Sequence, residues 1–218
     1  MITLEFFHDA VCGWCYLLSP RLRQIAEKYP VNIVHRAFVL QRNESEMIAR
    51  FGSMKQAKQE IMQHWQTCQR YAEHPELINI EGMRAASFDY PTGYLAAVYA
   101  KAIEQLGGQE AHWDFFDAVQ RAHLYESRNI GDADVLNAIA IAQGFSYAQV
   151  KAAVDSPDVE LGVLNDKRRA VEFGISSIPS LIINGSQLVS QTLTSAQLEQ
   201  LISSLMSSPN QEVVEEAL

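Results

Sequence analysis

The chain has 218 residues, of which 48% are hydrophobic, and it carries a formal charge of −9 at pH 7. This length suits one large domain or a domain with an insertion, and the apolar content can bury a core without disulfide bonds. The acidic balance argues against nucleic acid and anionic membranes as partners, and no run of about 18 apolar residues predicts a membrane span.

Residues 1–42 have the pattern of a strand, a helix and a second strand. In residues 2–7 apolar side chains fall on both faces, as in the central strand of a covered parallel sheet. A helical pattern runs from Gly13 to about Tyr29 and contains Pro20, which should bend the helix. Residues 31–40 are rich in Val and Ile and predict the second strand, so this half should be a parallel βαβ unit.

Residues 43–156 show one helical pattern after another and no convincing strand. The expected helices include one from near Thr92 to the pair Gly107 and Gly108, another through residues 113–119, and one capped by Asp132. This block should form an inserted helical domain.

Residues 157–207 predict a helix, two strands and a final helix. Ser156 followed by proline is typical of a helix start. Asn184 and Gly185 lie between two apolar runs and predict a hairpin with a type I′ turn. Residues 194–197, TSAQ, match a capping box. The acidic residues 208–218 should form a disordered tail.

The element order is therefore β-α-β, a helical block, then α-β-β-α. It predicts an α/β chain with the thioredoxin-like fold and a helical domain inserted between the two halves. The start MITLEFFHD lacks the basic residues, apolar run and cleavage site of a secretory signal. Three cysteines are also too few for a disulfide framework, so we expect a cytoplasmic protein.

The most informative motif is the pair Cys12 and Cys15, which follows the first strand at the start of the first helix. A C-x-x-C pair in that position is typical of thioredoxin-type redox centres. Free N–H groups at a helix start favour a thiolate, and thiols in such motifs have pKa values of roughly 3.5 to 7.5. One helical turn separates the two residues, so they can form a disulfide. Cys12 is the candidate nucleophile and Cys15 the candidate resolving thiol.

A zinc site is the alternative interpretation of these cysteines. A structural zinc ion needs four ligands, usually two pairs of Cys or His. Cys68 is isolated, no His-x-x-x-His pair is present, and His8 would add only a third ligand. We therefore predict no metal site and place Cys68 in the core beside Ile61 and Trp65.

With this motif and element order, the chain resembles the DsbA family of thiol–disulfide oxidoreductases, most closely its cytoplasmic FrnE-like branch. The matching segments are LEFFHDAV running into CGWCY and the later IPSLIINGSQLVS, and the resemblance covers nearly the whole length. In FrnE-like proteins the residue after the first cysteine is usually proline, whereas here it is Gly13. That departure bears on the redox potential rather than on the activity.

The resemblance implies a cis peptide bond before Pro179, facing the C-x-x-C pair. The backbone of Ile178 would then lie beside the sulfurs and could pair with an extended substrate segment. The alternative is a trans proline at the start of an edge strand.

Other residues near the motif are candidates for tuning the dithiol. Gly13 leaves backbone N–H groups open, and Trp14 offers an apolar surface to a substrate or packs in the core. Glu5, in the strand beneath the motif, could accept the proton of the resolving thiol, or face solvent at a sheet edge. His8 and Asp9 precede the motif; a protonated His8 would favour the thiolate, or it is an ordinary surface residue.

The expected reaction is thiol–disulfide exchange with a protein or small-molecule substrate, with a redox-active disulfide, no other cofactor, and glutathione as a candidate co-substrate. Two alternatives stay open. One is a glutathione-dependent isomerase or kappa-class glutathione transferase, which usually has serine where Cys12 stands. The other is a non-catalytic adaptor that holds a peptide over Trp14 and Pro179.

Overall fold

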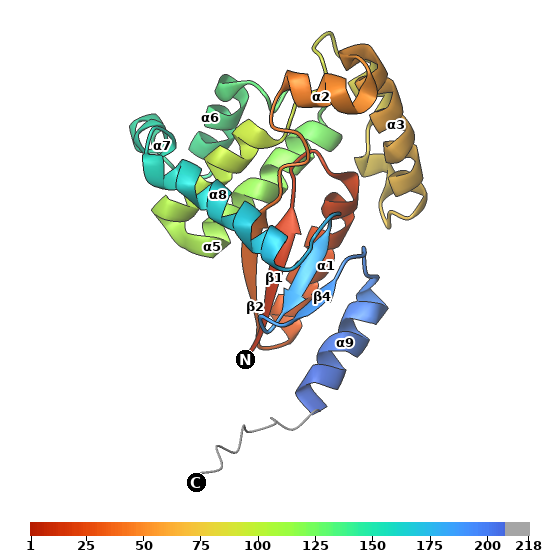
Figure 1. The fold of residues 1–218 in the computed structure, drawn as a ribbon, viewed down its shortest axis with the longest axis vertical. Coiled ribbons are helices and arrows are strands. Elements are labelled where there is room, and N and C mark those ends of the chain that lie inside the picture. The colour runs from red at the N-terminus through yellow and green to blue at the C-terminus, as the bar shows by residue number, and fades with distance from the viewer. Residues whose placement is uncertain (208–218) are drawn as a thin grey trace.

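A four-stranded mixed sheet organises residues 1–207, the part of the chain that the computed structural model describes (Figure 1). Its order is β2-β1-β3-β4, with β1 (Ile2–His8), β2 (Val31–Ala37), β3 (Ser180–Ile183) and β4 (Gln187–Val189). β1 is parallel to β2 but antiparallel to β3, which forms an antiparallel hairpin with β4. The prediction of a parallel sheet around β1 is therefore wrong on one side, because the hairpin enters from the opposite direction. The predicted tail, residues 208–218, lies outside the described residues.

The central strand β1 is covered on both faces, which explains its unbroken apolar pattern. Leu4 and Phe6 lie in the main core with residues of α1 (Gly13–Lys28) and α9 (Ser195–Ser207). Phe7 points to the other face and packs with Ala170 of α8 (Pro157–Glu172). Figure 1 shows α8 crossing that face of the sheet.

Among the described residues, the segment between β2 and α8 contains helices and no strand, as predicted. Its elements are α2 (Glu44–Phe51), α3 (Met54–Arg70), the 3₁₀ turn η1 (Pro75–Leu77), α4 (Ile80–Ala85), α5 (Tyr94–Leu124), α6 (Ala133–Ala142) and α7 (Tyr147–Val154). α5 is interrupted at Gly108, with φ 79° and ψ −169°, where two helices were expected to meet. The boundaries of the insertion at residues 43 and 156 stay predictions. No helix within residues 1–207 is both long and apolar enough to cross a membrane.

Local sequence signals set the ends of the later elements. The Ser156 side chain caps α8, and Thr194 and Gln197 exchange the two hydrogen bonds of a capping box before α9. In the hairpin, Asn184 and Gly185 have φ values of 48° and 69°, the positive angles that a type I′ turn requires. These ends were predictable because each depends on neighbouring residues.

β2 ends at Ala37 instead of continuing to residue 40. Beyond it, the Phe38 N–H donates to His8 O at 2.8 Å, and the Leu40 N–H donates to Asp9 Oδ2 at 2.8 Å. The chain therefore crosses the end of β1 and binds the loop before the cysteine pair.

Candidate active site

Cys12 is the N-cap of α1, at the point where the chain leaves β1 and enters the helix. Its Sγ accepts a hydrogen bond from the Cys15 N–H at 3.4 Å. Unpaired N–H groups and the helix dipole stabilise negative charge at this position. The local structure therefore presents the first sulfur at the N-terminal end of the helix, beside the free N–H groups.

Cys15 lies behind Cys12 in the protein. It is fully buried, whereas Cys12 keeps 8% of its surface exposed. Burial and the adjacent Cys12 raise the pKa of the Cys15 thiol well above its usual range. This difference suits an attacking Cys12 and a resolving Cys15 that reacts only with its neighbour.

Cys68 is buried in the core, as predicted, but it also touches the motif. A Cβ atom on residue 13 would lie 3.1 Å from Cys68 Sγ, tighter than ordinary packing. Glycine therefore allows α1 to approach α3, and a proline ring at this position would require Cys68 to move. Burial raises the pKa of Cys68 to about 12, so this thiol stays protonated at neutral pH.

The loop before β3 meets the cysteine pair from the other side. The peptide bond between Ile178 and Pro179 is cis, and Ile178 O lies 4.0 Å from Cys12 Sγ. The backbone of Ile178 is thus adjacent to the sulfur, in the place that the resemblance implied.

A cleft of about 400 Å³ opens over Cys12. Cys12 and Trp14 line it together with residues of α2, α3 and the Ile178 loop. Trp14 is partly exposed, and its ring centroid lies 5.6 Å from that of Tyr71. Arg50 and His64 add polar groups to a mostly apolar wall. The cleft has the size and composition of a small-molecule or peptide site.

Asp9 is a buried acid in the loop before the cysteines. Its carboxylate accepts N–H bonds from Val11 at 3.2 Å and Leu40 at 2.8 Å. Burial raises the pKa of Asp9 to about 6, although these hydrogen bonds lower it. After burial and Cys12, the charge of Asp9 is a further cause that raises the pKa of Cys15. The carboxyl group and the resolving thiol are therefore electrostatically linked.

Two residues of the helical insertion support this loop, and sequence reasoning missed both. Gln120 of α5 donates from Nε2 to Cys12 O at 3.1 Å and to Asp9 O at 3.5 Å. Gly93, the N-cap of α5, lies so close to Asp9 that a Cβ would be 1.6 Å from its Oδ1. A buried glutamine and a glycine before a helix are common features, so neither indicated a role in the sequence.

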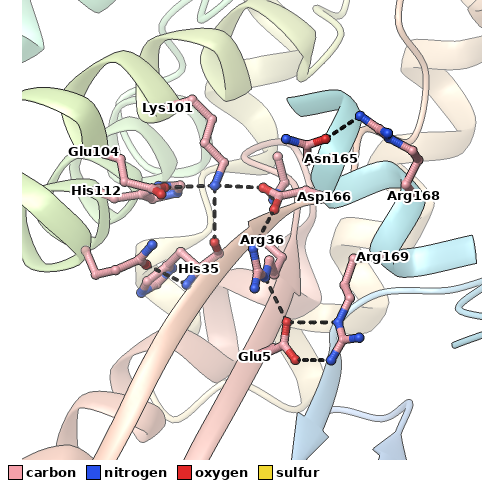
Figure 2. A network of polar contacts seen from close by, with 12 residues as sticks. Glu5, His35, Arg36, Lys101, Glu104, His112, Asn165, Asp166, Arg168 and Arg169 are labelled. Atoms are coloured by element: carbon pink, nitrogen blue, oxygen red, sulfur yellow. Dashed lines mark hydrogen bonds and ion pairs between the residues drawn. The ribbon is translucent and has the colours of Figure 1, made fainter. Parts of the chain in front are cut away.

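Glu5 has a different environment from either predicted one. It is 6% exposed, so the solvent-facing alternative is wrong. Its carboxylate accepts hydrogen bonds from Arg36 Nε at 2.9 Å and Arg169 Nη2 at 2.7 Å (Figure 2). Burial raises the pKa of Glu5, but the hydrogen bond from Arg169 and the charge of Arg36 lower it below the usual value. A carboxylate held in this way is a weak base, so the geometry does not support the general-base role.

The Glu5 group extends into a larger ion network, drawn in Figure 2. Arg36 also binds Asp166 of α8 at 3.1 Å, and Asp166 binds Lys101 of α5 at 2.8 Å. Lys101 in turn binds Glu104 at 2.8 Å. The network joins β1 and β2 to α5 and α8, so its role is to hold these elements together.

His8 is 4% exposed, so the alternative prediction of an ordinary surface residue is wrong. Its Nε2 lies 3.0 Å from His35 Nδ1 on β2. Burial lowers the pKa of His8 well below its usual range. A neutral imidazole facing β2 does not provide the positive charge that was predicted beside Cys12.

Comparison with known proteins gives a family and a set of similar folds. The family model described as a DSBA-like thioredoxin domain matches residues 3–205. No curated protein sequence matches the chain.

Three solved structures illustrate the similarity in fold. A probable DsbA oxidoreductase from Streptomyces coelicolor has a TM-score of 0.74 at 18% identity, covering 99% of this chain and 95% of its own. The cytosolic disulfide reductase DsbM from Pseudomonas aeruginosa has 0.73 at 18% identity, covering 94% and 100%, and its structure with GSH is also similar. A 2-hydroxychromene-2-carboxylate isomerase has 0.67 at 16% identity, covering 94% and 96%.

Proposed function

This chain belongs to the family of DsbA-like thioredoxin domains, and we propose that it catalyses thiol–disulfide exchange of the DsbA or FrnE type through Cys12 and Cys15. The family and the thioredoxin-like fold agree with the predicted resemblance. One observation carries the proposal: the Cys12 sulfur caps α1, accepts the Cys15 N–H, and lines an open cleft while Cys15 is buried behind it.

In the reducing direction, the Cys12 thiolate attacks one sulfur of a substrate disulfide. A mixed disulfide forms, and the other substrate sulfur leaves as a thiolate. Cys15 then gives up its proton and attacks Cys12 Sγ, which forms the internal disulfide and releases the second substrate thiolate. Two electrons pass from the pair to the substrate, and the oxidising direction reverses each step. The reduction potential of the pair decides the direction.

We assign to Asp9 the proton transfer of the second step. Cys15 must lose a proton in a buried position, where its pKa is well above the usual range. Asp9 has a pKa of about 6, so at neutral pH it is an ionised acceptor next to the reacting pair. Transfer directly or through one water would place the proton on this carboxylate, a role first predicted for Glu5.

The cleft suits a thiol or disulfide substrate of peptide or small-molecule size, held between Trp14 and the Ile178 backbone. Glutathione as co-substrate belongs to this proposal, supported by the similar fold of the DsbM structure with GSH. A cytoplasmic location is supported in the same way by the cytosolic protein of similar fold.

A glutathione-dependent isomerase is the second candidate, because the fold is also similar to a 2-hydroxychromene-2-carboxylate isomerase. It requires no second thiol, so an isomerase or conjugation activity that survives Cys15→Ser would favour it. A non-catalytic adaptor would bind peptide in the cleft without turnover.

The test of the leading proposal is turnover with insulin or a small aromatic disulfide. We expect Cys12→Ser to abolish turnover and Cys15→Ser to trap a mixed disulfide on Cys12. In the double variant Cys15→Ser, Cys68→Ala the Cys12 adduct should still form, which identifies Cys12 as the trapped sulfur. Undiminished turnover in Cys12→Ser would end the proposal.

A further inference from the structure

Three histidines from separate elements meet inside the protein: His8 of β1, His35 of β2 and His112 of α5. One ring nitrogen of each lies within 4.8 Å of the other two, and the residues are between 0% and 4% exposed. The rings of His35 and His112, both labelled in Figure 2, stack with centroids 5.0 Å apart. The ring of Phe116 lies 3.8 Å from that of His8 and shields the group from solvent.

Two nitrogens of this cluster have no hydrogen-bond partner among residues 1–207: His35 Nε2 and His112 Nε2. An unpaired buried polar atom costs about 1–3 kcal/mol, and folded proteins contain few of them. Such atoms call for a partner from outside the protein chain, such as an ion or a water.

Glu104 determines which ring nitrogen of His112 carries the proton. Its carboxylate pairs with Lys101 and lies 2.6 Å from His112 Nδ1, so it accepts the proton of that nitrogen. Neutral His112 then has a lone pair on Nε2, the nitrogen that has no partner. A carboxylate on the far nitrogen of a histidine is the usual support of a metal-binding imidazole, since it orients the ring and raises its basicity.

We propose that His8, His35 and His112 bind one transition-metal ion, and that Zn²⁺ is the ion best suited to three imidazoles in a closed site. The ligand nitrogens lie within 4.8 Å of one another, compared with roughly 3.3 Å between the ligands of a tetrahedral ion with Zn–N bonds of about 2.0–2.1 Å, so the three rings would close slightly on the ion. A void of about 10 Å³ touches His8 and His112. It has room for about one water beside these two rings.

The surrounding charges are compatible with a cation. Lys101 would oppose it, but its Nζ is bound by Glu104 and by Asp166, each at 2.8 Å. Burial lowers the pKa of all three histidines, which favours the neutral form that binds metals. The ion would join β1, β2 and α5, and it shares no ligand with the cysteine pair. The sequence indicated no such site because positions 8, 35 and 112 have no motif spacing.

The test uses the full chain with Cys12→Ser and Cys15→Ser, because the two thiols could bind zinc themselves. This protein is refolded with Zn²⁺, passed through a desalting column with EDTA, and analysed for metal by mass spectrometry. We expect about one zinc per chain. Refolding with Co²⁺ should give the visible bands of a tetrahedral site without thiolate charge-transfer absorption.

Two matched variants locate the site. In His112→Gln the bound zinc should be lost. His123→Gln removes another fully buried histidine of α5, whose Nε2 contacts Tyr90 Oη at 2.9 Å, and should retain the ion. If His112→Gln does not fold, His8→Gln provides the same comparison.

Loss of zinc in the cluster variants with retention in His123→Gln supports the proposal. It is overturned if the refolded parent binds no zinc and its melting temperature is the same with and without the metal. Zinc bound equally by the parent and a cluster variant overturns it as well.

Discussion

The loop around Asp9 and the network around Glu5 both bury a carboxyl group, but they provide it with different partners. Glu5 receives two arginines, and the pKa of its carboxyl falls below the usual value. Within residues 1–207, Asp9 receives only backbone N–H groups, and burial raises its pKa to about 6. Burial alone therefore does not decide what an acid does. The partners decide whether it stabilises the fold or exchanges protons near neutral pH.

The largest difference between the two carboxyl groups should appear in the rate of catalysis. Asp9→Asn removes the proposed proton acceptor while keeping a similar shape, so we expect the resolution of the mixed disulfide to slow about 10²-fold, typical of a lost general base. Stopped-flow measurement of that step gives the rate. Glu5→Gln should leave the rate per folded molecule unchanged, and an equal loss in both variants would contradict the assignment.

Stability should respond in the opposite order. Glu5→Gln leaves two arginines without their carboxylate, and we expect a loss of about 2–3 kcal/mol in the free energy of unfolding. This is below the value for a fully buried pair because Arg36 and Arg169 are 30% and 26% exposed. Glu172→Gln removes the exposed partner of the same Arg169 and should cost less than about 0.5 kcal/mol. Urea unfolding measures the free energy of unfolding of both variants. Equal losses would show that the buried Glu5 contributes no more to stability than the exposed Glu172.

The raised pKa of Asp9 also predicts a pH dependence. The folded protein holds this proton more tightly than the unfolded chain, whose carboxyl titrates near its ordinary 3.8. The contribution to stability is therefore largest in acid and is lost as pH rises through about 6. Relative to the wild type, Asp9→Asn should gain about 1 kcal/mol between pH 5 and pH 7, since one pKa unit corresponds to about 1.4 kcal/mol. A constant difference across this range would contradict the assigned pKa.

The smallest expected effect lies beside the same loop, at the contact of Gly13 with Cys68. Gly13→Ala should destabilise the protein by roughly 1 kcal/mol, because its Cβ would press on the Cys68 sulfur. In a Cys68→Ala background the same change should be neutral or stabilising. The double-mutant cycle should therefore give a coupling of roughly 1 kcal/mol or slightly more. Additive effects would show that Cys68 does not restrict residue 13.

Much of the fold was predictable because its signals are local. The cap at Ser156, the turn at Asn184 and Gly185, and the capping box at Thr194 each depend on residues within a few positions. The placement of Cys12 at a helix start was predictable for the same reason.

The partners of buried polar side chains were not predictable. Glu5 and His8 were assigned roles from their distance to Cys12 along the chain, but their partners come from residues 35, 36 and 169. The early end of β2 has a similar origin, since the Leu40 N–H binds Asp9 across the end of the sheet. Contacts between distant segments follow no fixed spacing along the chain, so a single sequence does not reveal them.

Gln120 has a consequence for attempts to simplify this protein. Its side-chain amide donates from the insertion to the backbone carbonyl groups of Asp9 and Cys12. The loop that carries the reactive cysteine is therefore held by a segment that lies outside the two thioredoxin-like halves. A shortened chain in which residues 43–156 are replaced by a linker would keep both sulfurs but lose this anchor. The shortened protein would therefore contain both thiols but would not hold them in the alignment that the exchange reaction needs.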